Sequence, residues 1–370
     1  MRIVYVLTSL GMGGAEKQAL AAAERMEKRG HAVALLVLSP RVPEEWSTAV
    51  ETAYLGMCKT PLSLLAGLVR GHRLLRDFRP DLIHSHSFHA NLFARLLRLR
   101  MPHLVVVSTV HNVYEGGWSR MLAYRLTDSL SRRTVAVSKA AADRFVRLKA
   151  IAERRCLVVT NGIDTAEFTP NSERRASSRS AMGVGQAAAR QGFIWLAAGR
   201  ITPAKDYPNL LRAFAKVRAH RSDALLWIAG ESMSAELVRL KEQSAQLDLG
   251  DSVRWLGLRR DMPVLLDAAD GFVSASAWEG MPLAVGEAMA MEKPVVATDV
   301  GGVRELVGGA GALVPAKNSE ALAEAMRSTM QRSEEEREQK GRAARERILR
   351  HFSVDAAANA WEALYRELLA

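Results

Sequence analysis

Short apolar runs alternate with longer helix-like patterns over almost the whole chain, and this alternation limits the possible folds more than any other feature. After most of these runs, apolar residues recur with the period of an α-helix. This order is typical of α/β proteins built on parallel sheets. The predicted strands lie near residues 2–7, 32–38, 81–84, 104–109, 134–137 and 157–159, and then near 193–198, 224–229, 253–256, 271–274, 294–297 and 312–314.

The chain is long for a single core of this kind, because its 370 residues are enough for two domains. A polar stretch rich in Arg, Ser and Ala, residues 169–191, predicts the linker and the start of the second domain. We therefore expect two doubly wound, Rossmann-like domains with a cleft between them. In such sheets ligands bind outside the carboxyl ends of the strands, and each candidate site below follows a predicted strand.

Residues 276–287 (SAWEGMPLAVGE) are the most informative segment. They lead from a predicted strand into an alanine-rich helix, with Pro282 in the first turn, where its missing N–H costs nothing. Glu279 lies in the turn before the helix, and Glu287 lies inside it. Carboxylates accept hydrogen bonds from hydroxyls, and the free N–H groups of a helix start favour an anion. The segment therefore predicts a site for a ligand with both hydroxyls and phosphates, such as a sugar nucleotide.

Two cations follow the first strand of the second domain. Arg200 and Lys205 lie in the loop after residues 193–198, where they could neutralise a diphosphate both when it is bound and when it leaves. The alternative is a pair of solvated surface cations, but their position at the carboxyl end of a strand favours a site. Leu258, after another predicted strand, could flank a base through its backbone groups.

The loop after the first strand contains Gly11, Gly13 and Gly14. Glycines at such a turn let the backbone approach a phosphate at the start of a helix. Their spacing lacks the third glycine of the dinucleotide fingerprint, and no acidic residue ends the second strand, so a nicotinamide cofactor is not expected. A purely structural tight turn is the alternative.

Histidines cluster in the first half of the chain. His84, His86 and His89 lie near the end of one predicted strand, and His111 follows the next. No carboxylate or cysteine accompanies them at ligand spacing, so a metal site is not predicted. We expect His111 to line the cleft, where a neutral imidazole could hydrogen-bond a substrate hydroxyl or act as acid or base. A structural role is the alternative for His111 and the expected role of His84 and His89.

The net positive charge is confined to the first half. Residues 1–165 contain 24 Lys and Arg against 13 Asp and Glu, whereas residues 166–370 contain 27 of each. Such a basic surface suits an anionic membrane or a lipid-linked phosphate, and no nucleic-acid-binding signature accompanies it. Residues 62–79, with four arginines among leucines, predict either a basic amphipathic helix at a membrane surface or an ordinary core-packing helix.

The cysteine content and the lengths of the apolar runs indicate the cellular compartment. Two cysteines provide no disulfide framework, which suits a reducing environment. No apolar run reaches the length of a membrane span. We therefore expect a cytoplasmic protein, peripheral on the inner face of the cytoplasmic membrane.

Together these motifs resemble the large family of retaining glycosyltransferases with the GT-B fold. The resemblance implies an acceptor-binding domain over residues 1–165, a donor-binding domain over 166–350, and a C-terminal helix over 351–370 that packs back on the N-terminal domain. The motifs that carry it are Gly13-Gly14-Ala15-Glu16, Ser138, Asn161-Gly162-Ile163-Asp164, Gly199-Arg200 with Lys205, the pair Glu279 and Glu287, and Asp299-Val300-Gly301-Gly302.

The resemblance implies that a sugar passes from a nucleotide diphosphate, most often UDP in this family, to an acceptor hydroxyl, with retained configuration and without a metal or other cofactor. Glu287 would bind the ribose and Glu279 the sugar hydroxyls. Arg200 and Lys205 would hold the diphosphate, and His111 would lie beside the sugar on the acceptor side. The expected catalytic residues are His111, Glu279, Arg200 and Lys205, and the rest of the donor site is expected at Gly13, Gly14, Leu258, Gly280, Met281, Pro282, Leu283 and Glu287.

The expected substrates are a hexose or N-acetylhexosamine donor and a lipid-linked or glycolipid acceptor in the assembly of cell-envelope glycans. Three alternatives stay open. The chain could be a sugar-nucleotide epimerase of the same fold, a phosphorylase, for whose pyridoxal cofactor no obvious lysine is seen, or a non-catalytic, membrane-associated binding protein.

Overall fold

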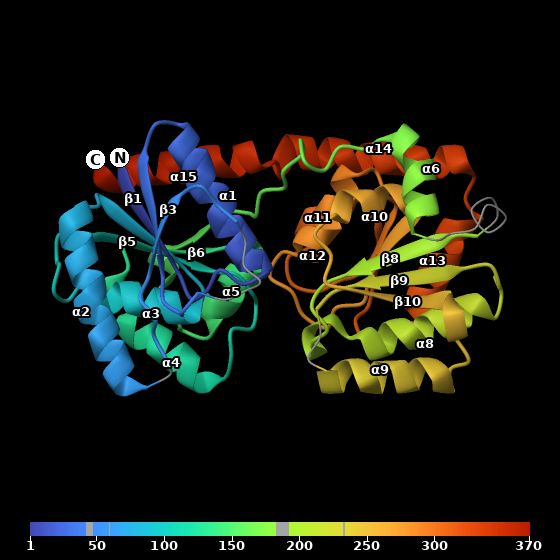
Figure 1. The fold of residues 1–370 in the computed structure, drawn as a ribbon, viewed down its shortest axis with the longest axis horizontal. Coiled ribbons are helices and arrows are strands. Elements are labelled where there is room, and N and C mark those ends of the chain that lie inside the picture. The colour runs from blue at the N-terminus through green and yellow to red at the C-terminus, as the bar shows by residue number, and fades with distance from the viewer. Residues whose placement is uncertain (42–46, 59, 183–191, 232–233) are drawn as a thin grey trace. The chain divides into compact units, whose positions relative to one another are not determined.

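The computed structural model describes residues 1–41, 47–58, 60–182, 192–231 and 234–370. It divides into two compact units: unit 1 comprises Met1–Gly162 and Val354–Ala370, and unit 2 comprises Ile163–Ser353. Each unit is a parallel sheet with helices packed on it (Figure 1), which confirms the predicted α/β class. The predicted domain boundaries, residues 165 and 350, lie close to residues 162 and 353, where the structure divides.

Unit 1 has a seven-stranded sheet in the order β3-β2-β1-β4-β5-β6-β7. The edge strand β3 was not predicted, because it is short and lacks an apolar run: its first residue is exposed and the other three are only partly buried. The other strands fall within two residues of their predicted positions. The strands are β1 (Arg2–Leu7), β2 (Ala32–Val37), β3 (Glu51–Tyr54), β4 (Leu82–His86), β5 (Val105–Val110), β6 (Arg133–Ala136) and β7 (Cys156–Val158).

The two faces of this sheet bury different helices, because successive residues of a strand point to opposite sides. In β1, Tyr5 and its alternate neighbours pack with α1 and α15, whereas Val4 and Val6 pack with α2 and α3 on the other face. Figure 1 shows both layers within unit 1. The helices are α1 (Gly14–Lys28), α2 (Pro61–Phe78), α3 (Phe88–Leu97), α4 (Trp118–Thr127), α5 (Lys139–Arg147) and α15 (Val354–Leu369), with short 3₁₀ turns at Asp128–Leu130 and Glu153–Arg155.

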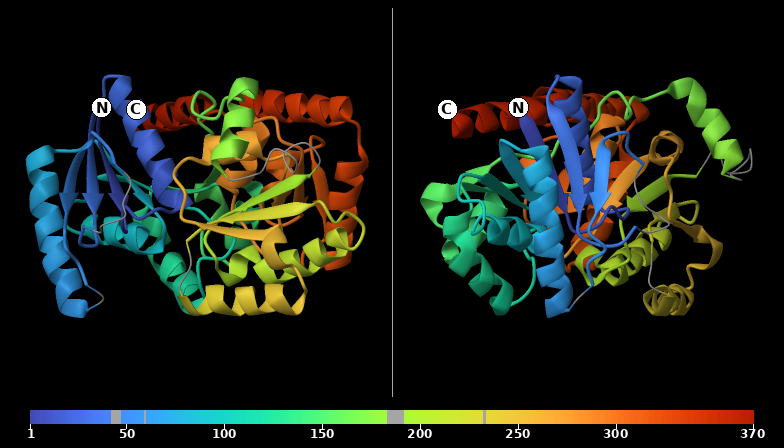
Figure 2. Two further views of the ribbon diagram at one scale, coloured as in Figure 1. Left: turned by 45° about the vertical axis from the view of Figure 1, so that its right-hand side comes forward. Right: turned by 60° about the vertical axis from the view of Figure 1, so that its left-hand side comes forward.

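Unit 2 has a six-stranded parallel sheet in the order β10-β9-β8-β11-β12-β13. Helices α8, α9 and α13 share a buried core with β8, and Figures 1 and 2 show α10 and α11 on the opposite face. The strands are β8 (Ile194–Ala198), β9 (Leu225–Ala229), β10 (Val253–Gly257), β11 (Gly271–Ser274), β12 (Val295–Thr298) and β13 (Ala312–Val314). The helices are α6 (Ser172–Ala181), α8 (Tyr207–Arg218), α9 (Ser234–Gln246), α10 (Met262–Ala268), α11 (Leu283–Ala290), α12 (Val303–Val307), α13 (Ser319–Gln331) and α14 (Glu334–His351), with 3₁₀ turns at Pro203–Lys205 and Gly250–Ser252.

Within residues 169–191, where the sequence predicts the linker and the start of the second domain, helix α6 belongs to unit 2. Arg175 and Arg179 of α6 form ion pairs with Asp270, and Arg174 pairs with a carboxylate at the end of α10. These arginines attach α6 to the rest of unit 2. Residues 183–191 lie outside the described residues.

The last two helices belong to different units. Helix α14 packs on α11 in unit 2, so closely that a Cβ on Gly341 would come within 2.1 Å of the Glu292 carbonyl oxygen. Helix α15 belongs to unit 1, where Trp361 and Tyr365 are buried in the core shared with α1, as packing residues rather than a binding stripe. An ion pair of 2.7 Å between Arg29 and Glu362 also joins α15 to the end of α1.

Candidate functional site

The loops with the predicted donor-site residues of unit 2 meet at one edge of its sheet. Strands β8, β11 and β12 are consecutive neighbours and parallel, so their carboxyl ends lie together. The loops that follow are residues 199–206, 275–282 and 299–302. Backbone hydrogen bonds join them: the Ala277 N–H donates to the Ala204 carbonyl at 2.8 Å, and the Gly302 N–H donates to the Gly280 carbonyl at 2.8 Å.

Lys205 and Glu279 are in direct contact at this edge. The Lys205 ammonium donates to Glu279 Oε1 at 2.5 Å, and the Ser276 hydroxyl donates to the same oxygen at 2.7 Å. Glu279 is only 7% exposed, while Lys205 is partly exposed. A buried carboxylate is stable only when it is paired and hydrogen-bonded, so this pair holds two oppositely charged groups in fixed positions beside solvent.

The turns after β8 and β9 each require a glycine. Gly199 has a φ of +149°, a conformation that favours glycine, and Tyr207 donates a hydrogen bond of 2.7 Å to its carbonyl. A Cβ on Gly230 would lie 2.0 Å from the Gly199 carbonyl oxygen. The backbones of the loops after β8 and β9 therefore touch, which sets the start of the segment that ends at Lys205.

Glu287 is buried inside helix α11, about one turn after its first residue. The helix begins at Leu283, and Pro282 is the N-cap rather than a first-turn residue as predicted, because its backbone is extended (ψ 116°). Gly280, Met281 and Pro282 are buried in the loop before it. The first N–H groups of an α-helix have no intrahelical partner, so the segment combines two carboxylates with a helix start, as the sequence indicated.

Two other predicted residues lie at the same edge but are not brought into this contact. The Arg200 side chain follows Gly199 and is exposed. Leu258 follows β10 and is 37% exposed, and β9 separates β10 from β8 in the sheet. The structure thus joins Lys205 and Glu279 directly and leaves Arg200 and Leu258 at the surface of the edge.

In unit 1, Gly13 and Gly14 lie where β1 leads into α1. Gly13 is the N-cap residue, with extended backbone, and its N–H donates to the Gly11 carbonyl at 2.7 Å. Gly14 begins the helix and is exposed. The predicted turn is present, and the Glu16 side chain lies so close to Gly13 that a Cβ there would come within 2.2 Å of it.

His111 follows β5 in unit 1 and belongs to a row of histidine rings. His111 Nε2 lies 2.9 Å from His86 Nδ1, and the rings of His86 and His84 are in contact, tilted by 41° with centroids 4.1 Å apart. Burial lowers the pKa of His111 to about 4 and lowers the pKa of His84 and His86 well below 6.5. All three rings are therefore neutral at pH 7.

Glu115 holds the loop after His111. Its carboxylate accepts hydrogen bonds from the His111 backbone N–H at 2.8 Å and from the Tyr124 hydroxyl at 2.6 Å. Sequence reasoning missed Glu115, Ser276 and the role of His86. A carboxylate four positions after a candidate histidine was a usable signal for Glu115, whereas the contact between His86 and His111 depends on the pairing of β4 with β5.

Neither a metal cluster nor a membrane helix is evident in what the structure describes. No three His, Cys, Asp or Glu side chains of the described residues gather as potential metal ligands. Within the same part of the chain, no helix combines the length and the apolar character needed to cross a membrane.

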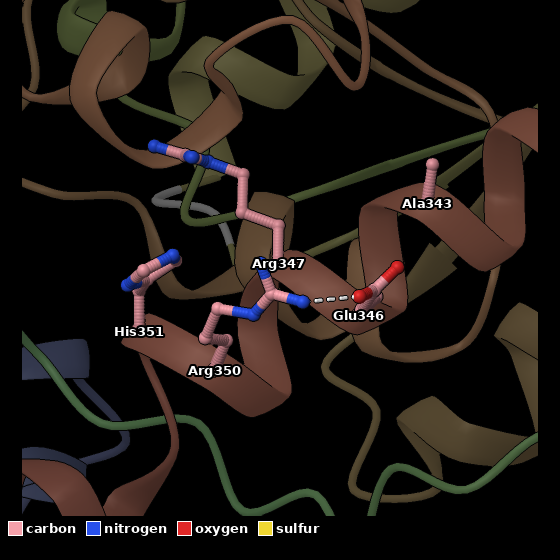
Figure 3. Close-up of a pocket in the computed structure, with 5 residues that line it drawn as sticks. All are labelled: Ala343, Glu346, Arg347, Arg350 and His351. Carbon is pink, nitrogen blue, oxygen red and sulfur yellow. Dashed lines mark hydrogen bonds and ion pairs between the residues drawn. The ribbon is translucent and has the colours of Figure 1, made fainter.

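A shallow hollow of about 160 Å³ on α14 is distinct from the predicted site residues (Figure 3). Its arginines are already engaged: Arg350 pairs with Glu346, and Arg347 donates to the carbonyls of Leu306 at 2.8 Å and Glu305 at 2.7 Å. We assign it no ligand, because its cations serve to attach and stabilise α14.

Comparison with known proteins gives two family matches. The model of the family described as glycosyl transferases group 1 matches residues 185–347. The model described as glycosyltransferase family 4 matches residues 12–167. The two matches cover the larger part of units 2 and 1, respectively.

Individual relatives agree with these matches. The alpha-maltose-1-phosphate synthase of Mycolicibacterium smegmatis is 31% identical over 78% of this chain and 79% of its own length. The UDP-Gal:alpha-D-GlcNAc-diphosphoundecaprenol alpha-1,3-galactosyltransferase of Escherichia coli is 26% identical over 66% of this chain and 64% of its own length. Among solved structures, Anabaena HepE in complex with UDP and glucose has a TM-score of 0.86 at 19% identity, over 99% of this chain and 100% of that one.

Proposed function

Because the chain belongs to the group 1 glycosyltransferases and has their GT-B fold, we propose that it transfers a hexose or N-acetylhexosamine from a nucleotide diphosphate sugar, with retained configuration. UDP is the first candidate for the nucleotide, since the similar Anabaena structure contains UDP. The acceptor is a hydroxyl of a lipid-linked saccharide or glycolipid in envelope glycan assembly, as the name of the Escherichia coli relative suggests.

One observation carries this proposal: the contact between Lys205 and Glu279 at the central edge of unit 2. A cation suited to phosphate and a carboxylate suited to sugar hydroxyls are in contact at 2.5 Å, so a single ligand with a diphosphate beside a sugar can reach both. When the donor binds, its phosphate takes the Lys205 ammonium. Glu279 is then free to accept hydrogen bonds from the sugar.

The other residues of the site bind different parts of the donor. Glu287 in α11 accepts from the ribose hydroxyls, and the start of α11 faces the anionic part of the donor. Arg200, exposed beside Gly199, supplies a second cation to the diphosphate. As the bond to the sugar breaks, negative charge grows on the leaving diphosphate, and both cations stabilise it more strongly than in the ground state.

The proposed retention of configuration assigns these groups a different use from that in a hydrolase. In a retaining hydrolase one carboxylate attacks the anomeric carbon while another donates a proton. Here Glu279, hydrogen-bonded to Ser276, is assigned to recognition of the sugar hydroxyls, and we assign no nucleophile. The acceptor hydroxyl instead attacks on the face that the diphosphate leaves, and the departing phosphate takes its proton.

We also propose that unit 1 touches an anionic membrane, where a lipid-linked acceptor lies. Helix α2 has exposed Leu62 and Leu65 along its first half, and exposed Arg73 and Arg76 follow along its second half. Helix α4 exposes Trp118, Leu122 and Leu126 at four-residue spacing. Apolar side chains can enter the headgroup region while arginines contact anionic lipid, which accounts for the location of the excess charge.

Transfer assays test the proposal. Lys205→Ala and Glu287→Ala should each lower kcat/KM by about 100-fold or more, since each removes a charge-assisted contact to the donor. Circular dichroism should show that both variants remain folded. Unchanged turnover in both variants would contradict the assignment, and a donor sugar that changes configuration without any acceptor would favour a sugar-nucleotide epimerase instead.

A further inference from the structure

The row of histidine rings in unit 1 contains one ring nitrogen that has no hydrogen-bond partner among the described residues, and the proposed reaction gives this nitrogen no role. His84 is fully satisfied, because its Nδ1 lies 2.6 Å from the Tyr365 hydroxyl and its Nε2 lies 2.7 Å from the Thr109 hydroxyl. His86 is different. Its Nδ1 faces His111 Nε2 at 2.9 Å, but its Nε2 is buried and has no hydrogen-bond partner among the described residues.

The contact between His86 and His111 links the protons of the two rings. A neutral imidazole carries one N–H and one bare nitrogen, so exactly one proton lies between His86 Nδ1 and His111 Nε2. If that proton is on His86, then His86 Nε2 is bare and His111 carries its own proton on Nδ1. If it is on His111, then His86 carries an N–H at the buried Nε2, and His111 Nδ1 is bare.

Burial of His86 Nε2 decides between these two arrangements. A buried N–H without an acceptor is rarer in proteins than an under-satisfied acceptor, and leaving it unpaired costs on the order of 1–3 kcal/mol. His84 provides no acceptor, since both of its nitrogens are engaged. The arrangement with the shared proton on His86 is therefore the stable one.

We propose that His86 is a positioning residue that fixes His111 as a neutral ring with its proton on Nδ1. His111 then presents an N–H donor through its remaining nitrogen and does not act as a base. The low pKa of both rings agrees with neutral forms at pH 7. This inference rests on the proposed function only for its kinetic consequence: His111 donates to an oxygen of the substrate, while the departing phosphate takes the acceptor's proton.

The tautomer of His111 can be observed directly. In the full chain labelled with ¹⁵N-histidine, long-range ¹⁵N–¹H correlation spectra at pH 7.5 distinguish a protonated from a bare ring nitrogen, and the spectrum of His111→Gln identifies the signals of this ring. We expect a protonated Nδ1 and a bare Nε2. In His86→Leu, we expect more than half of the His111 population to move to the other tautomer.

Two further variants test whether His86 acts by positioning His111 or only by packing in the core. His86→Asn keeps an amide donor near the place of Nδ1, so the His111 tautomer should be restored and kcat should stay within about threefold of wild type. His86→Leu should lower kcat about tenfold, in the range found when a group that orients a functional side chain is removed, with little change in the donor KM. His84→Gln, in the same row but bonded elsewhere, should leave the His111 tautomer unchanged.

Two results would overturn the inference: a protonated Nε2 on His111 in the wild-type protein, or the same His111 tautomer in wild type and a folded His86→Leu. If His86→Leu does not fold, the wild-type spectrum alone decides. The spectra require no substrate. A failure of sugar transfer would therefore contradict the proposed function and leave this inference standing.

Discussion

At the scale of single residues, the candidate site depends on buried groups that are paired. From their positions after predicted strands, sequence reasoning placed Lys205 and Glu279 in one shared site, but it could not find their direct contact. That contact requires β8 and β11 to be neighbours, and strand order is not readable from a single chain. Ser276, which shares the same carboxylate oxygen, was missed for the same reason: an isolated serine gives no signal until its partner is known.

The histidine row makes the stability of unit 1 depend on pH. Burial lowers the pKa of His111 to about 4, whereas the unfolded chain has a value near 6.5. As the pH falls from 6.5 towards 4, the unfolded state binds a proton that the native state does not bind. The free energy of unfolding therefore decreases by about 1.4 kcal/mol per pH unit for each such histidine. Above pH 6.5 this contribution is constant.

Urea unfolding at pH 7.0, 6.0 and 5.0 measures this dependence. His111→Gln should reduce the slope of unfolding free energy against pH by about one proton between pH 6 and 5. His84→Gln should act in the same direction, because burial lowers the pKa of His84 as well. Equal slopes in wild type and both variants would show that these rings are not held neutral.

At the scale of elements, most helices and strands could be predicted from apolar periodicity, and two of the misses share a cause. Strand β3 and helix α6 contain few apolar residues, so their positions are set by partners and not by a local pattern. For α6 the partners are carboxylates: Asp270 accepts from Arg179 at 2.6 Å and from the Ile194 backbone N–H at 2.8 Å, and it also pairs with Arg175.

The substitution Asp270→Asn tests how α6 is attached. It removes the charge opposite two partly buried arginines, so unit 2 should lose about 2–4 kcal/mol of unfolding free energy, as when one partner of a buried pair is removed. Glu338→Gln is the matched control, because Glu338 pairs with Arg342 at 3.3 Å on the exposed face of α14. The control should lose about 0.5 kcal/mol or less. Equal losses in the two variants would mean that α6 is held by other contacts.

At the scale of the whole molecule, charge and exposed apolar groups coincide in unit 1. The excess of 24 basic over 13 acidic residues lies in residues 1–165, and the exposed Leu62 and Trp118 belong to the same unit, 80% and 78% accessible. The charge division could be read from the sequence. The exposed apolar face of α4 could not be predicted from the sequence, because the spacing of its apolar residues is that of any helix. Only the packing shows which side of the helix remains uncovered.

Co-sedimentation with vesicles tests this surface in the full-length protein. Binding to vesicles with anionic lipid should weaken as salt rises, since the attraction is electrostatic. Leu62→Ser and Trp118→Ser should each weaken it about 10-fold, because each removes one apolar side chain from the interface. Leu349→Ser is the control, an exposed leucine of unit 2, and should have no effect. Binding that is independent of salt, or equally sensitive to all three changes, would contradict a docking surface on unit 1.

The central claim is that the loops after β8 and β11 bind the diphosphate and ribose of the donor, and calorimetric titration tests it most directly. UDP, GDP and ADP are titrated into wild type, Lys205→Met, Glu287→Gln and the control Lys216→Met, which changes an exposed cation of α8. The account predicts that one nucleotide binds wild type and the control equally and binds the other two variants about 10-fold or more weakly. Equal affinity in all four proteins would contradict it.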